Sequence, residues 1–141
     1  MKTIYLALTA VFFTTSCSHL AHLNSIAYDE PYEISVNTTS KTIDNRYVIK
    51  FDSVLNESRC PKGVECVWQG YAKVRFILTD STRPKQSRSV ELYTLKRGDM
   101  NDEAIFNHLK IKLLLLSPYP SVKSEIQHSK YRAKIIISKM N

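Results

Sequence analysis

Apolar and polar side chains alternate along several stretches of the second part of the chain. In residues 72–78 every second position is apolar, and Lys73 and Arg75 lie between the apolar ones. The same period of two runs through residues 111–115 and 131–137. This period is typical of a β-strand with one buried side and one side facing water. The pattern therefore predicts a strand in each of the three stretches.

Weaker alternation in residues 32–36, 47–51 and 90–92 brings the expected number of strands to about six. Turn-forming clusters separate the stretches, and the only helical feature expected is a single turn in residues 101–108. The pattern predicts an all-β fold, either a small antiparallel β-sandwich or a small barrel. The side chains expected to face its core are Tyr47, Ile49, Phe51, Val74, Phe76, Leu92, Ile111, Leu113, Leu115, Ile135 and Ile137.

One expected strand lacks a polar side. Residues 111–116 are apolar at nearly every position. A continuous apolar strand is typical of the middle of a sheet that is covered on both faces. We therefore expect this strand to be central and buried on both sides.

The N-terminal segment predicts export. Lys2 precedes an apolar stretch, then small residues, then Cys17, which is the pattern of a secretory signal peptide over residues 1–16. The apolar stretch is about half as long as a membrane-spanning helix requires. A cysteine directly after the small residues resembles the lipoprotein signal of bacteria, in which that cysteine is lipidated and becomes the first mature residue. The alternative is simple secretion, with cleavage nearby and no role for Cys17.

The remaining sequence divides into a tether and one domain. Residues 17–29 lack a clean period and are expected to form a short lipidated tether, and residues 30–141 are expected to form a single β-domain. The 141 residues are 43% hydrophobic, which suits one packed core. We expect an envelope protein anchored to a membrane, most simply at the periplasmic side of an outer membrane, with secretion as the alternative.

Cys60 and Cys66 form an even pair in a chain expected to be exported, and this favours a disulfide. The loop between them contains the turn formers Pro61 and Gly63. The alternative is a metal or redox pair, although none of the four histidines lies near it in the sequence. Trp68, two residues on, is expected to fill the core beside the disulfide, with stacking on a ligand as the alternative.

A longer motif surrounds this pair. Residues 58–74 read S-R-C-P-K-G-V-E-C-V-W-Q-G-Y-A-K-V. The motif resembles the S-R-C-P-x-G-V-x-C-x-W-x-G stretch of a family of small bacterial envelope proteins, many of them lipoproteins, that has no assigned activity. Residues 115–120 and 131–137 resemble the closing strand pair of the same family. The resemblance implies export, the disulfide and a β-fold, and it carries over no catalytic residue and no ligand.

Motifs for catalysis and for cofactors are absent from the sequence. It contains no nucleophile elbow, no phosphate-binding loop, no dinucleotide glycine motif and no H-E-x-x-H, and it has only three glycines. An acidic cluster at Asp99, Asp102 and Glu103 lacks the order of a calcium-binding loop. We therefore expect no enzyme, no cofactor and no bound metal.

Positive charge is the most distinctive remaining feature, since 20 basic and 13 acidic residues give a net charge of +7. Six basic residues take outward positions on three expected strands: Lys73, Arg75, Lys110, Lys112, Arg132 and Lys134. If these strands are neighbours, one sheet face carries all six and attracts an acidic envelope component or an acidic protein. The alternative is a solvated face that prevents edge pairing. Nucleic acid is not expected as a partner of an exported chain.

Two functions follow from these features. The first is a non-catalytic structural or binding module of the envelope, with partner and oligomeric state left open. The second is a secreted inhibitor of a protease or lysozyme that presents residues 59–68 as a rigid loop. In that case Arg59 or Lys62 enters the target cleft, and Trp68 belongs to the same loop.

Overall fold

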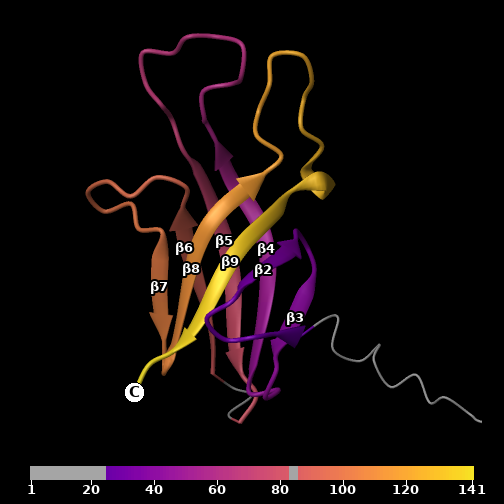
Figure 1. Cartoon of the computed structure of the whole chain (residues 1–141), viewed down its shortest axis with the longest axis vertical. Helices are drawn as coiled ribbons and strands as arrows, with labels where there is room; N and C mark the ends of the chain where they lie inside the picture. The colour runs from indigo at the N-terminus through magenta and orange to yellow at the C-terminus, as the bar shows by residue number, and fades with distance from the viewer. Residues whose placement is uncertain (1–24, 83–85) are drawn as a thin grey trace, which may run out of the picture.

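Two β-sheets enclose one hydrophobic core, and the computed structural model describes residues 25–82 and 86–141 (Figure 1). The first sheet has the order β1-β3-β4-β5-β6, with β1 (Ser25–Ile26), β3 (Thr39–Thr42), β4 (Tyr47–Glu57), β5 (Ala72–Asp80) and β6 (Ser87–Tyr93). The second has the order β2-β9-β8-β7, with β2 (Pro31–Ser35), β9 (Arg132–Lys139), β8 (Leu109–Ser117) and β7 (Glu103–Phe106). All neighbouring strands are antiparallel except β1 and β3. The predicted all-β sandwich is confirmed.

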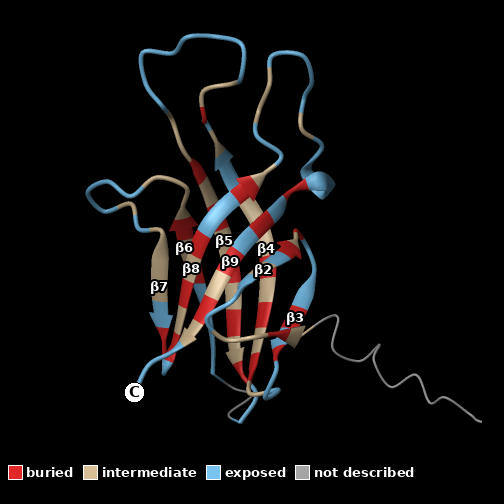
Figure 2. Ribbon diagram, viewed as in Figure 1, coloured by how far each residue is buried: buried red, intermediate tan, exposed pale blue. Residues whose placement is uncertain are grey.

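The core is filled from alternate positions of the long strands (Figure 2). Along β5, the side chains of Val74, Phe76 and Leu78 are fully buried, and the residues between them are partly exposed. Phe76 stacks on Phe51 of β4 with ring centroids 5.0 Å apart. All the strands expected from the period of two are present, and every residue expected in the core is buried except Leu115.

A β-bulge in β8 explains the exception. The register of β8 against β9 shifts between Leu113 and Leu115, so β8 contains one residue more than its partner there. Leu114 and Leu115 consequently point outward, at 42% and 53% exposure, and Leu116 turns into the core. The expectation that residues 111–116 are buried on both sides is therefore wrong, although β8 does lie inside its sheet, between β9 and β7.

Three short strands have no clear alternation in the sequence. β7 forms within residues 101–108, where a helical turn was expected, because this segment pairs with β8. β1 pairs with β3 and places Ile26 in the core with no exposure. Residues 25–29 therefore belong to the domain, and the prediction of a tether through residue 29 is wrong for them.

The two ends of the sandwich differ. Three long loops, residues 58–71, 94–102 and 118–131, leave the same end, which is the upper end in Figure 1. The opposite end carries the short turns, the start of the described chain beside β3, and the C-terminus. We call the first of these the loop end.

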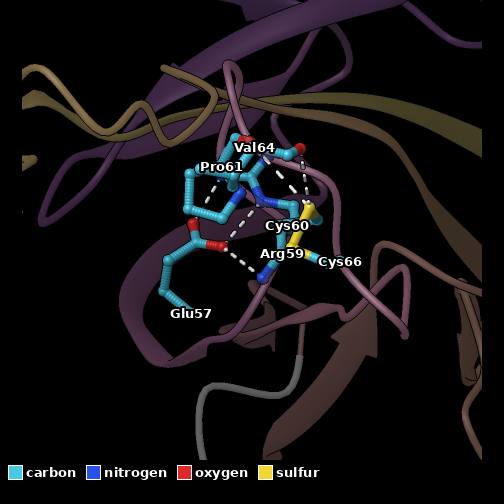
Figure 3. Close-up of a disulfide and its surroundings, with 6 residues drawn as sticks. All are labelled: Glu57, Arg59, Cys60, Pro61, Val64 and Cys66. Carbon is cyan, nitrogen blue, oxygen red and sulfur yellow. Dashed lines mark hydrogen bonds and ion pairs between the residues drawn. A yellow bond between two sulfur atoms is a disulfide. The ribbon is translucent and has the colours of Figure 1, made fainter.

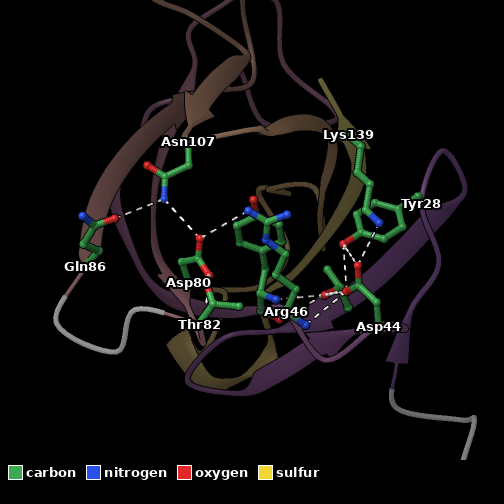
Figure 4. A network of polar contacts seen from close by, with 10 residues as sticks. Tyr28, Asp44, Arg46, Asp80, Thr82, Gln86, Asn107 and Lys139 are labelled. Carbon is green, nitrogen blue, oxygen red and sulfur yellow. Dashed lines mark hydrogen bonds and ion pairs between the residues drawn. The ribbon is translucent and has the colours of Figure 1, made fainter. Parts of the chain in front are cut away.

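A polar network closes the opposite end (Figure 4). The carboxylate of Asp44 accepts hydrogen bonds from the Tyr28 and Thr42 hydroxyls at 2.9 and 2.7 Å and from the Arg46 amide at 3.1 Å. Lys139, at the end of β9, forms an ion pair with it at 2.8 Å. Partial burial favours the protonated acid, but these contacts together hold the pKa of Asp44 well below its usual range. The network ties the β3–β4 turn to the last strand.

Candidate functional site

The Cys60–Cys66 disulfide is present and closes a short loop at the loop end (Figure 3). The two Cα atoms lie 5.9 Å apart, a separation that suits a disulfide. This confirms the pairing expected from the cysteine count. The loop projects beyond the ends of β4 and β5, outside the packed core.

Arg59, next to the first cysteine, is buried and not available to enter a partner's cleft. Only 6% of the residue is exposed. Its guanidinium group binds both carboxylate oxygens of Glu57, with Nε 2.8 Å from Oε1, and also donates to the carbonyls of Leu116 and Pro118 at 2.6 and 3.1 Å. The prediction of Arg59 as an inserting residue is therefore wrong. It joins the disulfide loop to the start of the 118–131 loop instead.

Glu57 is the acidic centre of this junction. Besides Arg59, it accepts a hydrogen bond from the Tyr131 hydroxyl, with 3.2 Å between the oxygens. Burial, together with the negative charge of Glu57, raises the pKa of Tyr131 to about 12. Glu57 thus connects the end of β4, the disulfide loop and the residue before β9.

Backbone hydrogen bonds fix the two sides of the loop to each other. The amides of Ser58 and Cys60 donate to the carbonyls of Tyr71 and Gln69 at 2.9 and 3.0 Å. Gly70 has a φ of +66°, and a Cβ there would lie 1.7 Å from the Ser58 carbonyl oxygen. Only glycine allows this close approach. The loop therefore leaves the sandwich as a rigid, closed strip.

The outer part of the strip carries exposed apolar side chains. Trp68 is 72% exposed and Val67 is 92% exposed, and Val64 inside the disulfide ring is 47% exposed. The prediction that Trp68 fills the core is therefore wrong. The disulfide lies outside the sandwich, so a residue two positions beyond it has no core to enter. Lys62 is also exposed, and its backbone amide donates to the Pro120 carbonyl at 2.9 Å.

The six basic residues expected on one face are divided between the two sheets. Lys73 and Arg75 lie on the outward side of β5 in the first sheet, and both form ion pairs with Glu91. The Arg75 guanidinium group lies 3.0 Å from the Glu91 carboxylate. The other four, Lys110, Lys112, Arg132 and Lys134, lie on β8 and β9 in the second sheet. The outer sides of the two sheets point in opposite directions, so the prediction of a single basic face is wrong.

Acidic neighbours also neutralise part of the second group. Lys112 lies 3.6 Å from Asp102, and Arg132 lies 3.3 Å from Glu33. Lys134 is directly opposite Glu33 in the β2–β9 register. Such exposed pairs contribute little to stability, but they reduce the field that a sheet face presents to an anion.

Residues that line a polar hollow at the opposite end bond to one another (Figure 4), although the buried Nε of Arg46 has no hydrogen-bond partner among the described residues. It has a volume of about 360 Å³ and surrounds the buried carboxylate of Asp80. Asp80 accepts hydrogen bonds from Thr82 at 2.7 Å and from Asn107 at 3.3 Å, and Arg46 lies 3.8 Å away. The Thr82 hydroxyl contributes most to holding the pKa of Asp80 below its usual range. The arrangement braces the turns of this end.

The remaining expectations concern metals and the N-terminal segment. Among residues 25–82 and 86–141, no three histidine, cysteine or acidic side chains are grouped as metal ligands would be. The same residues contain no helix with the length and hydropathy needed to cross a membrane. Cys17, the signal peptide and the first part of the expected tether lie outside the described residues.

The loop end thus carries the disulfide, its buried anchor and the most exposed aromatic side chain of the described chain. Comparison of the whole chain with protein-family models, with curated proteins and with solved structures gives no match.

Proposed function

We propose that this chain is a non-catalytic binding module of the bacterial cell envelope, and that it recognises a partner protein with its loop end. The observation that carries the proposal is the adjacent pair Val67 and Trp68, which project into solvent from a rigid loop. Exposed apolar side chains on a fixed scaffold are typical of interaction surfaces. Tryptophan in particular is enriched among residues that dominate binding energy.

The anchoring of the loop supports this proposal. A flexible loop loses conformational entropy when it binds, and this loss weakens affinity. Here the Cys60–Cys66 disulfide, the buried Arg59 and the close approach at Gly70 order the loop before any partner arrives. Burial of Trp68 and Val67 in a partner then gains hydrophobic free energy at a small entropic loss.

The position of Ser25, the first described residue, supports a lipid anchor at Cys17. Seven residues lie between Cys17 and Ser25, so the two Cα atoms can be at most about 28 Å apart along an extended chain. Ser25 pairs with Lys41 of β3, at the end of the sandwich opposite the loops. An anchor there would direct the loop end away from the membrane. The non-reducing intact mass of the protein from its host's membrane fraction tests this arrangement, since an acylated chain beginning at Cys17 is expected.

A photocross-linking experiment tests the binding function. Val67 is replaced by p-benzoylphenylalanine in the full chain, expressed in its host and irradiated. We expect one discrete adduct with an envelope protein. A matched probe at Lys41, an exposed position on β3, should give none. The partner identified by mass spectrometry should bind the purified Trp68→Ala and Val67→Ser double variant at least tenfold more weakly. An adduct pattern that is the same at both positions contradicts the proposal.

The inhibitor function remains a second candidate because of Lys62. This residue is exposed within the disulfide-closed ring, and its backbone is held by the neighbouring 118–131 loop. An exposed basic side chain on a backbone held in this way fits the specificity pocket of a trypsin-like protease. We expect inhibition by the native protein and none by Lys62→Ala if this function holds. Absence of inhibition of trypsin-like proteases and lysozymes at micromolar dose removes it.

A further inference from the structure

A groove runs along one side of the disulfide loop, between it and residues 94–102. Its volume is about 500 Å³, which is room for a small ligand and not for a protein domain. The groove lies at the base of the strip that carries Trp68. The residues that line it include Trp68, Tyr71, Leu95, Lys96, Arg97 and Met100.

The groove combines an aromatic wall with an apolar lining. Trp68 supplies a largely exposed indole ring. Tyr71 packs against Tyr93 with ring centroids 5.6 Å apart, and this contact fixes the tyrosine ring. Leu95 and Met100 add half-buried aliphatic surface. An exposed aromatic ring packs well against a face of C–H groups on a ligand.

Two cations stand at the edge of this apolar surface. The Lys96 ammonium group lies 3.9 Å from the Asp102 carboxylate, and the lysine side chain is 64% exposed. Arg97 is exposed, and within residues 25–82 and 86–141 its guanidinium group has no ion pair or hydrogen bond. Its backbone is held by reciprocal hydrogen bonds with Met100 at 3.2 and 3.0 Å. A guanidinium group on a fixed backbone binds a carboxylate through two parallel hydrogen bonds.

Four backbone amides beside the groove are already paired. The amides of Ser58 and Cys60 are bonded across the disulfide strip, and the amides of Tyr93 and Thr94 donate to Asn101 and Ala72 at 2.9 and 3.0 Å. A peptide that adds a strand to a sheet needs free backbone groups along an edge. These four amides are not available to a peptide strand, and the aromatic and basic residues of the lining favour recognition by ring stacking and by charge.

We infer that this groove binds an acidic saccharide, a second ligand of the loop end that goes beyond the proposed recognition of a partner protein. The C–H side of one sugar ring packs on the indole of Trp68, and its carboxylate binds Arg97 with support from Lys96. Gln69 also lines the groove, and its side-chain amide can form hydrogen bonds with hydroxyl groups. Neutral sugars of the same size keep the stacking and lose the ion pair.

The test uses the intrinsic fluorescence of the protein, because the chain contains one tryptophan and it lies in the groove. The full chain is titrated with tetragalacturonate and, separately, with maltotetraose. We expect a saturable change in emission with tetragalacturonate and at least tenfold weaker binding of maltotetraose. Arg97→Ala should weaken tetragalacturonate binding at least tenfold. Lys123→Ala removes the same charge from an exposed position on another loop and should leave binding unchanged.

Three results would overturn the inference. The first is no saturable response to tetragalacturonate. The second is equal weakening by Arg97→Ala and Lys123→Ala, which indicates a general charge effect. The third is tighter binding of tetraglutamate than of tetragalacturonate at the same residues, which makes the groove a peptide site. The cross-link from position 67 does not involve Arg97, so its survival in Arg97→Ala separates failure of this inference from failure of the proposed function.

Discussion

Arg59 binds both carboxylate oxygens of Glu57, although only one residue separates them along the chain. The pair lies where β4 ends and the disulfide loop begins, and the same guanidinium group reaches the carbonyls of Leu116 and Pro118. An ion pair between residues close in the sequence therefore holds together two loops that lie far apart in the sequence. We expect the direction in which Trp68 projects to depend on this junction.

Removal of Glu57 should destabilise the domain and release the loop. Glu57→Ala leaves the buried guanidinium group without its counter-charge, and breaking a buried pair in this way costs about 3 kcal/mol. Urea unfolding at pH 7 measures this difference. Glu65→Ala, which removes an exposed carboxylate from the same loop, is the control and should have little effect. Equal stability of the two variants would show that the junction is unimportant.

Loss of the disulfide should affect binding more than folding. The bridge spans a sequence separation of six, and the chain-entropy estimate for so short a loop is about 2 kcal/mol. The core lies outside this loop, so Cys60→Ala with Cys66→Ala should keep the far-ultraviolet circular dichroism of the native protein. The yield of the cross-link from position 67 should fall at least fivefold. Retention of full cross-linking would mean that the loop needs no covalent closure.

Two glycines offer a matched comparison, because both have positive φ angles. At Gly98 a Cβ meets nothing within 4 Å, so Gly98→Ala should lose only about 1 kcal/mol through left-handed strain. At Gly70 the added carbon collides with the Ser58 carbonyl, so Gly70→Ala should be several times more destabilising. Thermal unfolding distinguishes the two. Similar melting temperatures would contradict the close approach.

Asp44 should contribute a stability that disappears in acid. Its pKa is lower in the folded protein than in the unfolded chain, so its contribution is fully present above about pH 4 and declines as the pH falls. Asp44→Asn should therefore be less stable than the native protein between pH 5 and 8. The difference, of order 1 kcal/mol, should narrow below pH 4. A difference that stays constant down to pH 2 would exclude this carboxylate as the cause. Asp99→Asn controls for the loss of one exposed negative charge.

The strands that carry the core were predictable because apolar and polar side chains alternate strongly in a strand that has one side buried and one side facing water. Val74 and Phe76 are examples, and both are fully buried. β3 was not predictable in this way, since its sequence is Thr-Ser-Lys-Thr and polar Thr42 is nevertheless fully buried. Its hydroxyl is satisfied by Asp44 and the backbone of Tyr47. The bulge that turns Leu115 outward depends on pairing with β9, which the local pattern does not encode.

The site was predictable only in part. The cysteine count identified the disulfide, which lies within the segment of the S-R-C-P motif. A charged arginine is ordinarily exposed and a tryptophan ordinarily buried, but here Arg59 is buried and Trp68 is exposed. Contacts with residues distant in the sequence determine both positions. The basic face failed for a topological reason. Lys73 and Lys134 have the same alternation in sequence, but their strands belong to different sheets.

The parallel pairing of β1 has a mechanical consequence. A pull on the N-terminus enters the fold at Ser25–Ile26, whose two residues pair with β3 in the first sheet. The next element, β2, pairs with β9 in the second sheet over five residues. A short strand therefore stands in series with a longer one. Under tension β1 should detach first and lengthen the chain by about 20 Å, while the core and the loop end stay folded.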